Sequence, residues 1–265
     1  MHAFEYHKPG STKDALALGK KDEARYLAGG QSLVQAMKLR LSSPSDLIDL
    51  GGLKELSFVK ASSGGVEIGA MTRHAEVAGS KEVQKAIPAL AALAGIIGDR
   101  QVRHMGTIGG SLANNDPAAD YPAAALGLGA TIVTNKRKIE ADKFFKGLYE
   151  TALEAGELIT SVSFPAPKRA AYMKFKNPAS RFAIVGVFVA DFGGGKVRVG
   201  VTGAGPSAFR QAEMEKALGA KFAPDAVAGI KLKADGLNND LHASPEYRAH
   251  LITVMAKRAV EAALK

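Results

Sequence analysis

The spacing of apolar and polar residues along the first half of the chain predicts short helices mixed with short strands. Ser11 to Asp14 is typical of a capping-box helix start, and Leu33, Val34 and Met37 have helical spacing. The predicted helices run from Ser11 to about Lys20, from Gln31 to about Lys38, near 73–78, from Pro88 to about Ile97, and from about Pro122 to Leu128. The predicted strands are Ala24–Leu27, Asp46–Leu50, Phe58–Lys60, Val66–Ala70, Thr131–Thr134, Lys138–Glu140 and Leu158–Phe164. Residues 98–122 are glycine-rich, and we interpret them as a loop.

The second half shows longer strand patterns and ends in a helix. Pro165-Ala166-Pro167 marks the best candidate for a domain boundary. Three strands are predicted after it, at Ala171–Lys176, Ala183–Asp191 and Lys196–Gly203, followed by helices at about Ser207–Leu218, Pro224–Ile230 and Pro245–Leu264. Because strands and helices do not alternate regularly, the fold class is α+β.

Composition narrows the range of functions. A chain of 265 residues is long enough for two domains, and it contains no cysteine, which excludes disulfides, cysteine-ligated zinc and iron–sulfur clusters held by this chain. The six histidines have no metal-binding spacing. The net charge is +9, but lysine and arginine are dispersed and not interleaved with aromatic residues, so nucleic-acid binding is not indicated. We find no membrane span and expect a cytoplasmic protein.

Two passages have paired glycines flanked by small and hydroxyl-bearing residues. The first is Ala28-Gly29-Gly30-Gln31-Ser32, between a predicted strand and a predicted helix; the second runs from Thr107 to Pro117. Glycines allow successive backbone N–H groups to face one concavity and allow the chain to approach a phosphate closely. Glycine pairs also mark ordinary turns, so each passage alone is weak evidence. Together they indicate a site for an anionic ligand.

Competing motifs are absent. Gly200 to Gly205 has the wrong order for a dinucleotide fingerprint, and Gly195-Lys196 lacks the hydroxyl residue of a P-loop. Neither a nucleophile elbow nor an acid–base pair can be identified. We therefore predict no catalytic residue and no metal ligand, and we interpret the chain as the holder of a cofactor.

At these residues the chain resembles the FAD-binding medium subunit of the carbon monoxide dehydrogenase and xanthine dehydrogenase family. AGGQS at 28–32 and DRQVRHMGTIGGSLANNDPAADYP at 99–122 carry the resemblance, and KFKNPASRFAIVGV at 174–187 and VGVTGAGPSAFR at 199–210 extend it over essentially the whole chain. It implies a PCMH-type (vanillyl-alcohol-oxidase-like) FAD-binding domain at 1–167, with α/β subdomains at about 1–54 and 55–167. It also implies a small α+β domain at 168–265, with a three-stranded antiparallel sheet and helices.

The resemblance also assigns cofactor contacts. One side of the FAD pyrophosphate would contact Ala28, Gly29, Gly30, Gln31, Ser32 and Leu33, and the other side Thr107, Gly110, Ser111 and Asn114. Ala113 would lie near the flavin, Asp120 near the sugar or ribityl region, and Ile159 and Lys176 along the flavin or its pocket. The alternatives are a helix cap at Asp120, a core position at Ile159 and a surface charge at Lys176. Arg103 and His104 would either place the loop or meet a partner subunit, and many relatives carry asparagine in place of His104.

The family implies partners as well. A molybdopterin-containing large subunit would oxidise the substrate, and a [2Fe-2S] small subunit would pass electrons to FAD and on to quinone, NAD or oxygen, in a dimer of heterotrimers. Without cysteine, the chain cannot carry the additional cluster loop of some relatives. One alternative is a stand-alone flavin-dependent oxidoreductase of the same fold, which co-purification with partner subunits would exclude. Another is a nucleic-acid-binding scaffold, which salt-dependent DNA binding without flavin would indicate.

Overall fold

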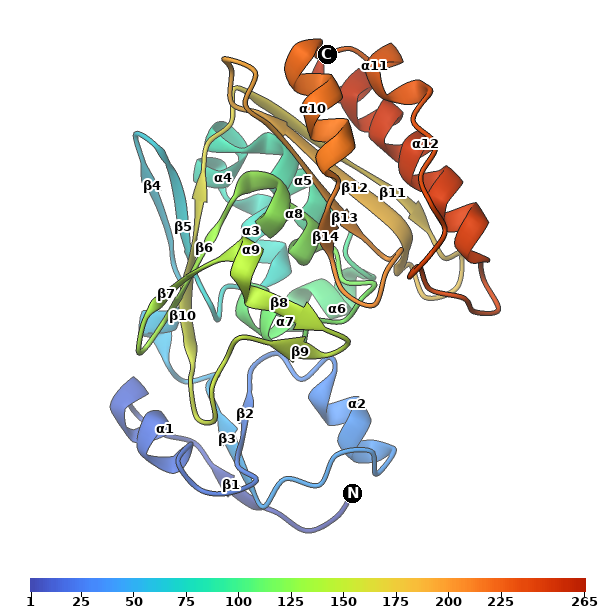
Figure 1. Ribbon diagram of the computed structural model, residues 1–265. Helices are drawn as coiled ribbons and strands as arrows, with labels where there is room; N and C mark the ends of the chain where they lie inside the picture. The colour runs from blue at the N-terminus through green and yellow to red at the C-terminus, as the bar shows by residue number, and fades with distance from the viewer.

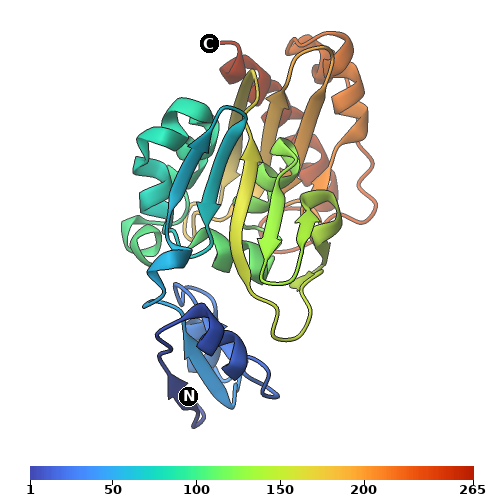
Figure 2. The same ribbon diagram turned by 90° about the vertical axis from the view of Figure 1, so that its left-hand side faces the viewer.

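The first subdomain lies at one end of the molecule, as the lower, blue part of Figures 1 and 2. The computed structural model describes all residues from Met1 to Lys265. The subdomain contains a three-stranded parallel sheet in the order β1-β3-β2 and a small apolar core. Its elements are β1 (Glu5–His7), α1 (Thr12–Leu18), β2 (Arg25–Leu27), α2 (Leu33–Lys38) and β3 (Asp46–Asp49), followed by the 3-10 helix η1 (Lys54–Leu56).

The second subdomain is built on a five-stranded antiparallel sheet in the order β4-β5-β10-β6-β7. These strands are β4 (Val59–Ser62), β5 (Gly65–Gly69), β6 (Thr131–Thr134), β7 (Lys138–Glu140) and β10 (Ile159–Pro165). Its helices are α3 (His74–Gly79), α4 (Lys81–Ala86), α5 (Pro88–Gly95), α6 (Arg100–Met105), α7 (Ile108–Asn114), α8 (Tyr121–Leu128) and α9 (Ala141–Phe144). A small hairpin pairs β8 (Phe145–Gly147) with β9 (Glu150–Thr151).

The interpretation of residues 98–122 as one loop was wrong, because α6 and α7 lie within it. Both helices are capped by side chains: Asp99 accepts from the Val102 N–H at 2.8 Å, and Thr107 accepts from the Gly110 N–H at 3.1 Å. Close packing explains why glycine stands inside α7, because a larger residue would not fit there. A Cβ at Gly109 would lie 2.6 Å from the Cβ of Ala70.

The carboxy-terminal domain contains a four-stranded antiparallel sheet, β11-β12-β13-β14. Its elements are β11 (Arg169–Lys176), β12 (Ala183–Asp191), β13 (Val197–Thr202), β14 (Phe209–Arg210), α10 (Ala212–Ala220), α11 (Asp225–Ala228) and α12 (Pro245–Ala263). The prediction of three strands missed β14, which has two residues and is too short to show an alternating pattern. For the same reason the helix predicted from Ser207 begins later, at Ala212.

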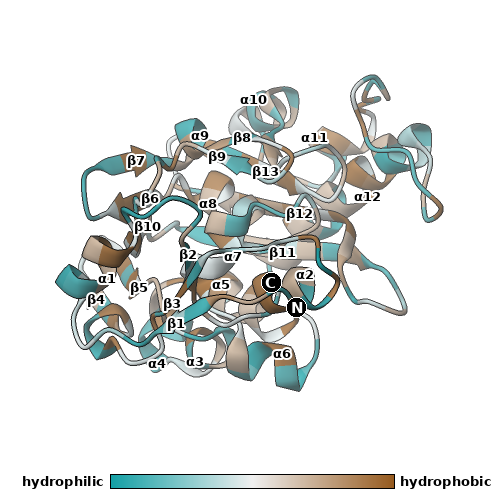
Figure 3. Ribbon diagram, turned by 90° about the horizontal axis from the view of Figure 1, so that it is seen from below, coloured by the Kyte–Doolittle hydropathy of each residue, from teal (hydrophilic) through white to brown (hydrophobic).

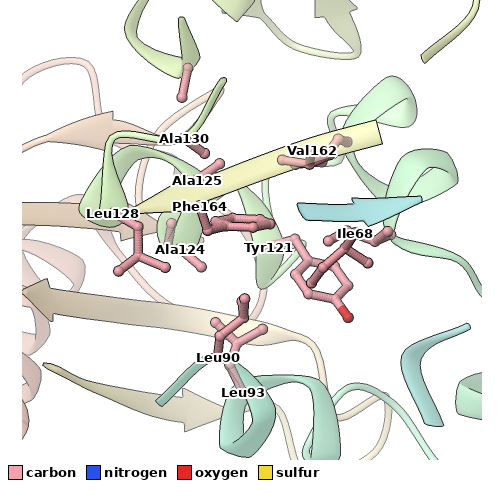
Figure 4. Close-up of a cluster of buried hydrophobic side chains, with 14 of the residues drawn as sticks. Ile68, Leu90, Leu93, Tyr121, Ala124, Ala125, Leu128, Ala130, Val162 and Phe164 are labelled. Carbon is pink, nitrogen blue, oxygen red and sulfur yellow. The ribbon is translucent and has the colours of Figure 1, made fainter. Parts of the chain in front are cut away.

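The core continues across the boundary between the two domains. α8 lies between the five-stranded sheet and the carboxy-terminal sheet (Figure 1), and every residue of α8 is buried. Its Tyr121, Ala124, Ala125 and Leu128 pack with Val162 and Phe164 of β10 (Figure 4). The same cluster includes Phe188 of β12, whose nine residues are all buried. On the other face of that sheet, α10 and α12 close a second core.

No helix of the chain combines the length and the apolar character that crossing a membrane requires. Nor do three or more histidine, aspartate or glutamate side chains gather where they could hold a metal ion.

Candidate cofactor-binding site

Two segments far apart in the sequence meet at the proposed site. The turn after β2 lies against the end of α6: a Cβ on Gly29 would be 2.1 Å from the Met105 carbonyl oxygen and 2.7 Å from the Gly106 Cα. A Cβ on Gly110 would be 3.4 Å from the Cβ of Ala28. Views at right angles to each other place α2 beside α6 and α7 (Figures 1 and 3). The convergence of the two glycine passages, predicted from the resemblance, is therefore present in the fold.

The first turn offers a row of unpaired donors. Within the chain, no backbone N–H from Ala28 to Leu33 donates a hydrogen bond. Gly30 has a φ of +70°, a left-handed conformation that glycine adopts without steric cost. Ser32 occupies the N-cap position of α2 but makes no side-chain capping bond, so its exposed hydroxyl is also available. Successive unpaired amides beside small side chains form the kind of concavity that binds a phosphate group.

The second passage contributes in a different way from the first. Its leading amides are already used, because the Ile108 N–H donates to the Thr72 carbonyl at 3.1 Å and the Gly109 N–H to Ala70 at 2.8 Å. What α7 leaves open is one helical face, which carries Gly110, Ser111, Ala113 and Asn114. The opposite face, with Ile108, Gly109, Leu112 and Asn115, is buried. Predicted contact residues thus share the open face, except Thr107, which is buried as the helix cap.

The segment between α7 and α8 is braced by the carboxy-terminal domain. The Gly203 N–H donates to the Pro117 carbonyl at 2.7 Å, and the Thr202 hydroxyl lies 2.6 Å from the Ala119 carbonyl. Asn115, at a left-handed φ of 43°, places its side-chain amide 2.8 Å from two carbonyls of the β8–β9 hairpin. The carboxy-terminal domain and the β8–β9 hairpin therefore together shape the segment that leads to Asp120.

Asp120 occupies the N-cap position of α8, but its side chain neither caps the helix nor lies at the surface. Its side chain is 3 % exposed and makes no capping bond to α8. The Tyr172 hydroxyl donates to Asp120 Oδ1 at 2.6 Å, and the Lys174 ammonium lies 2.9 Å from the same oxygen. Burial raises the pKa of the Asp120 carboxyl, and the Lys174 charge offsets part of that rise.

The remaining predicted residues occupy different environments. Ile159 is buried in the main core at the start of β10, while Lys176 is exposed at the end of β11. Arg103 donates to the carbonyls of Ile97 at 3.0 Å and Gly98 at 3.3 Å, so it places the entry to α6. His104 is exposed beside it.

Sequence reasoning missed three buried polar residues near the site: Tyr172, Lys174 and His74. A lysine two residues after a tyrosine, on the same face of one strand, was the available signal for the first two. His74 packs 5.3 Å, ring to ring, from Tyr121, and neither His74 Nδ1 nor the Tyr121 hydroxyl has a hydrogen-bond partner. Burial, with the nearby Arg103 charge, lowers the pKa of His74 to about 4.

Comparison with known proteins gives one consistent result. Residues 2–167 match the model of the FAD binding domain in molybdopterin dehydrogenase, and residues 170–263 match that of the CO dehydrogenase flavoprotein C-terminal domain. The chain is 35 % identical to the glyceraldehyde dehydrogenase medium chain of Sulfolobus acidocaldarius, over 97 % of this chain and 96 % of the relative. It is 35 % identical to the carbon monoxide dehydrogenase medium chain of Hydrogenophaga pseudoflava, over 98 % and 96 %. A chain of the reconstituted CO dehydrogenase from Oligotropha carboxidovorans superposes with a TM-score of 0.91 at 35 % identity, covering 99 % of this chain and 98 % of that one.

Proposed function

Because the chain belongs to the FAD-binding medium subunits of the carbon monoxide and xanthine dehydrogenase family, we propose a specific way in which its residues hold FAD. It is the FAD-binding, electron-transfer subunit of a heteromeric oxidoreductase of the molybdenum hydroxylase type. The expectations of the fold class, the cofactor and this role are confirmed.

The pyrophosphate of FAD would lie between the first turn and the open face of α7. The unpaired amides from Ala28 to Leu33 would donate to its oxygens, with Ser32 as an additional hydroxyl donor. From the other side, Gly110 leaves room, and Ser111 and Asn114 offer polar side chains. The observation that carries this proposal is the contact of Gly29 with the Met105–Gly106 peptide, because it fixes the two sides at one place.

Toward the flavin end, we assign Ala113, Asp120, Ile159 and Lys176. Asp120 would accept a hydrogen bond from the sugar or ribityl region, and Ile159 would present an apolar wall. When bound, FAD supplies a redox centre that accepts electrons singly and releases them in pairs. The chain's own contribution is binding geometry and electrostatics. We assign no acid–base residue to it.

Relatives named as medium chains belong to enzymes with further subunits, so large and small partner subunits are implied. We propose that the small subunit carries the [2Fe-2S] clusters, since this chain has no cysteine to ligate them. The large subunit would carry the molybdopterin, and the assembly would be a dimer of heterotrimers. The acceptor, whether quinone, NAD or oxygen, and a cytoplasmic location also stay predictions.

The test is reconstitution of the purified chain with FAD, followed by co-expression with its partner subunits. We expect a yellow protein that binds one FAD per chain, and reduction of that flavin by substrate only when the partners are present. A chain that stays colourless and takes up no FAD would refute the assignment of the cofactor. Substrate-dependent flavin reduction by the isolated chain would instead establish the stand-alone oxidoreductase.

A further inference from the structure

A lysine from the carboxy-terminal domain reaches across the domain boundary to the buried carboxylate of Asp120. Lys174 lies on β11, and its side chain is 3 % exposed. Its Nζ is 2.9 Å from Asp120 Oδ1 and 3.2 Å from Oδ2, and it donates to the Ile96 carbonyl at 3.2 Å. Lysine is rarely buried unless it is paired. This pair therefore joins β11, the start of α8 and the residue that follows α5.

The hydrogen-bonding capacity of this cluster is unequally used. Tyr172 has one hydroxyl proton, and it is donated to Asp120. The three Lys174 protons serve the two carboxylate oxygens and the Ile96 carbonyl. Asp120 accepts from both residues, yet a carboxylate has about four lone-pair sites. The carboxylate therefore keeps acceptor capacity, and Lys174 and Tyr172 fix its orientation.

Other cations hold the same stretch of backbone. Arg103 donates to the Ile97 and Gly98 carbonyls, and Arg181, which precedes β12, approaches the Gly98 carbonyl at 3.5 Å. Lys174 and Arg181 both belong to the carboxy-terminal domain. That domain therefore fixes the segment from Ile96 to Gly98 as well as the carboxylate of Asp120.

We propose that Lys174 is a positioning residue of the FAD pocket: it holds the Asp120 carboxylate as a fixed anionic acceptor for a ribityl hydroxyl, so that cofactor retention depends on the docked carboxy-terminal domain. The proposal rests on the proposed function. The ribityl group is preferred to the adenosine sugar because Lys176, assigned to the flavin end, lies two residues further along the same strand.

The experiment measures FAD binding to the full-length apoprotein by quenching of flavin fluorescence. The variants are Lys174→Met, Lys174→Arg, and the double variant Asp120→Asn with Lys174→Met. The double variant leaves no unpaired buried charge, so it should fold even if Lys174→Met alone does not. Lys168→Met, at an exposed lysine of the same domain, is the matched control. ADP, used as a competitor of FAD rebinding, reports on the two turns without the flavin half.

We expect the dissociation constant for FAD to rise at least about tenfold in Lys174→Met and in the double variant. In Lys174→Met the Asp120 carboxylate is no longer held in position for the ribityl hydroxyl, and in the double variant the charged acceptor itself is removed. Lys174→Arg should recover part of this loss, and the ADP inhibition constant should stay within about twofold of the original. A folded double variant with unchanged FAD affinity would overturn the proposal, as would equal weakening of FAD and ADP. If the original chain binds no FAD at all, the proposed function itself fails.

Discussion

Replacing Gly29 with alanine tests whether the two turns must touch in order to bind FAD. The added Cβ would lie 2.1 Å from the Met105 carbonyl oxygen, whereas ordinary contact begins at 3.4 Å. The obstacle is backbone on the opposite side, which cannot rotate away as a side chain could. The first turn must therefore retreat from α6 by ~1 Å or more, because the neighbouring interior is close-packed.

A displacement of this size would misalign two or more of the amides that face the cofactor. Hydrogen bonds to a charged group contribute about 1.5–3 kcal/mol each, so losing two costs at least about 3 kcal/mol. We therefore expect the dissociation constant for FAD to rise by a factor of about 100 or more.

The assay is titration of the apoprotein with FAD, with circular dichroism and thermal unfolding recorded on the same samples. Gly79→Ala is the matched control, because a Cβ there meets no atom within 4 Å and the residue ends α3. It should bind FAD as the original chain does. If Gly29→Ala binds FAD within about threefold of that value, the amides of the first turn do not hold the pyrophosphate.

Three further outcomes follow from buried or open polar groups. Burial lowers the pKa of His74 to about 4 from 6.5, so the unfolded chain binds more protons between these values; stability is complete above pH 6.5 and falls by up to about 3 kcal/mol toward pH 4. In His74→Phe, the free energy of unfolding, measured by urea titration at several pH values, should fall less between pH 6.5 and pH 4. An unchanged pH dependence would contradict the argument. Asn115→Gly keeps the left-handed backbone but loses two hydrogen bonds to the β8–β9 hairpin, so the free energy of unfolding should fall by about 2 kcal/mol. Asn115→Ala should lower the free energy of unfolding further, because alanine is strained in the left-handed conformation. Equal values for the two variants would show that the backbone conformation carries no cost. Ser111→Ala, on the open face of α7, should weaken FAD binding about threefold to tenfold with an unchanged melting temperature, and unchanged affinity would remove Ser111 from the site.

Sequence patterns predicted the longer elements well, because burial leaves a regular trace in them. The continuous apolar run of β12 and the proline-started helix α12 are examples. α7 was missed because its two glycines lower helix propensity, and α6 because it has only six residues between Gly98 and Gly106. Their caps, Asp99 and Thr107, were nevertheless visible in the sequence.

The candidate site could be predicted only in part. The resemblance indicated which two passages converge, but periodicity alone could not show that the amides of the second are mostly used. Nor could it distinguish Lys174 from Lys176, since both are lysines near the end of one strand. Their difference arises from Asp120, which lies more than fifty positions earlier in the chain and reaches only Lys174. Tertiary contacts of this kind leave no local pattern.

The position of α8 between two sheets has a consequence for how this protein can be divided. A truncation after Pro165 would strip Phe188 and Tyr172 from the cluster around α8 and leave both fragments with an uncovered apolar face. A junction near residue 54 disturbs less of the core, because the cluster there has only six buried residues, of which Leu56 and Leu158 come from the second subdomain. A chimera joined there should be expressed as a folded protein that does not aggregate. A chimera joined between Pro165 and Pro167 should aggregate unless both halves come from the same parent.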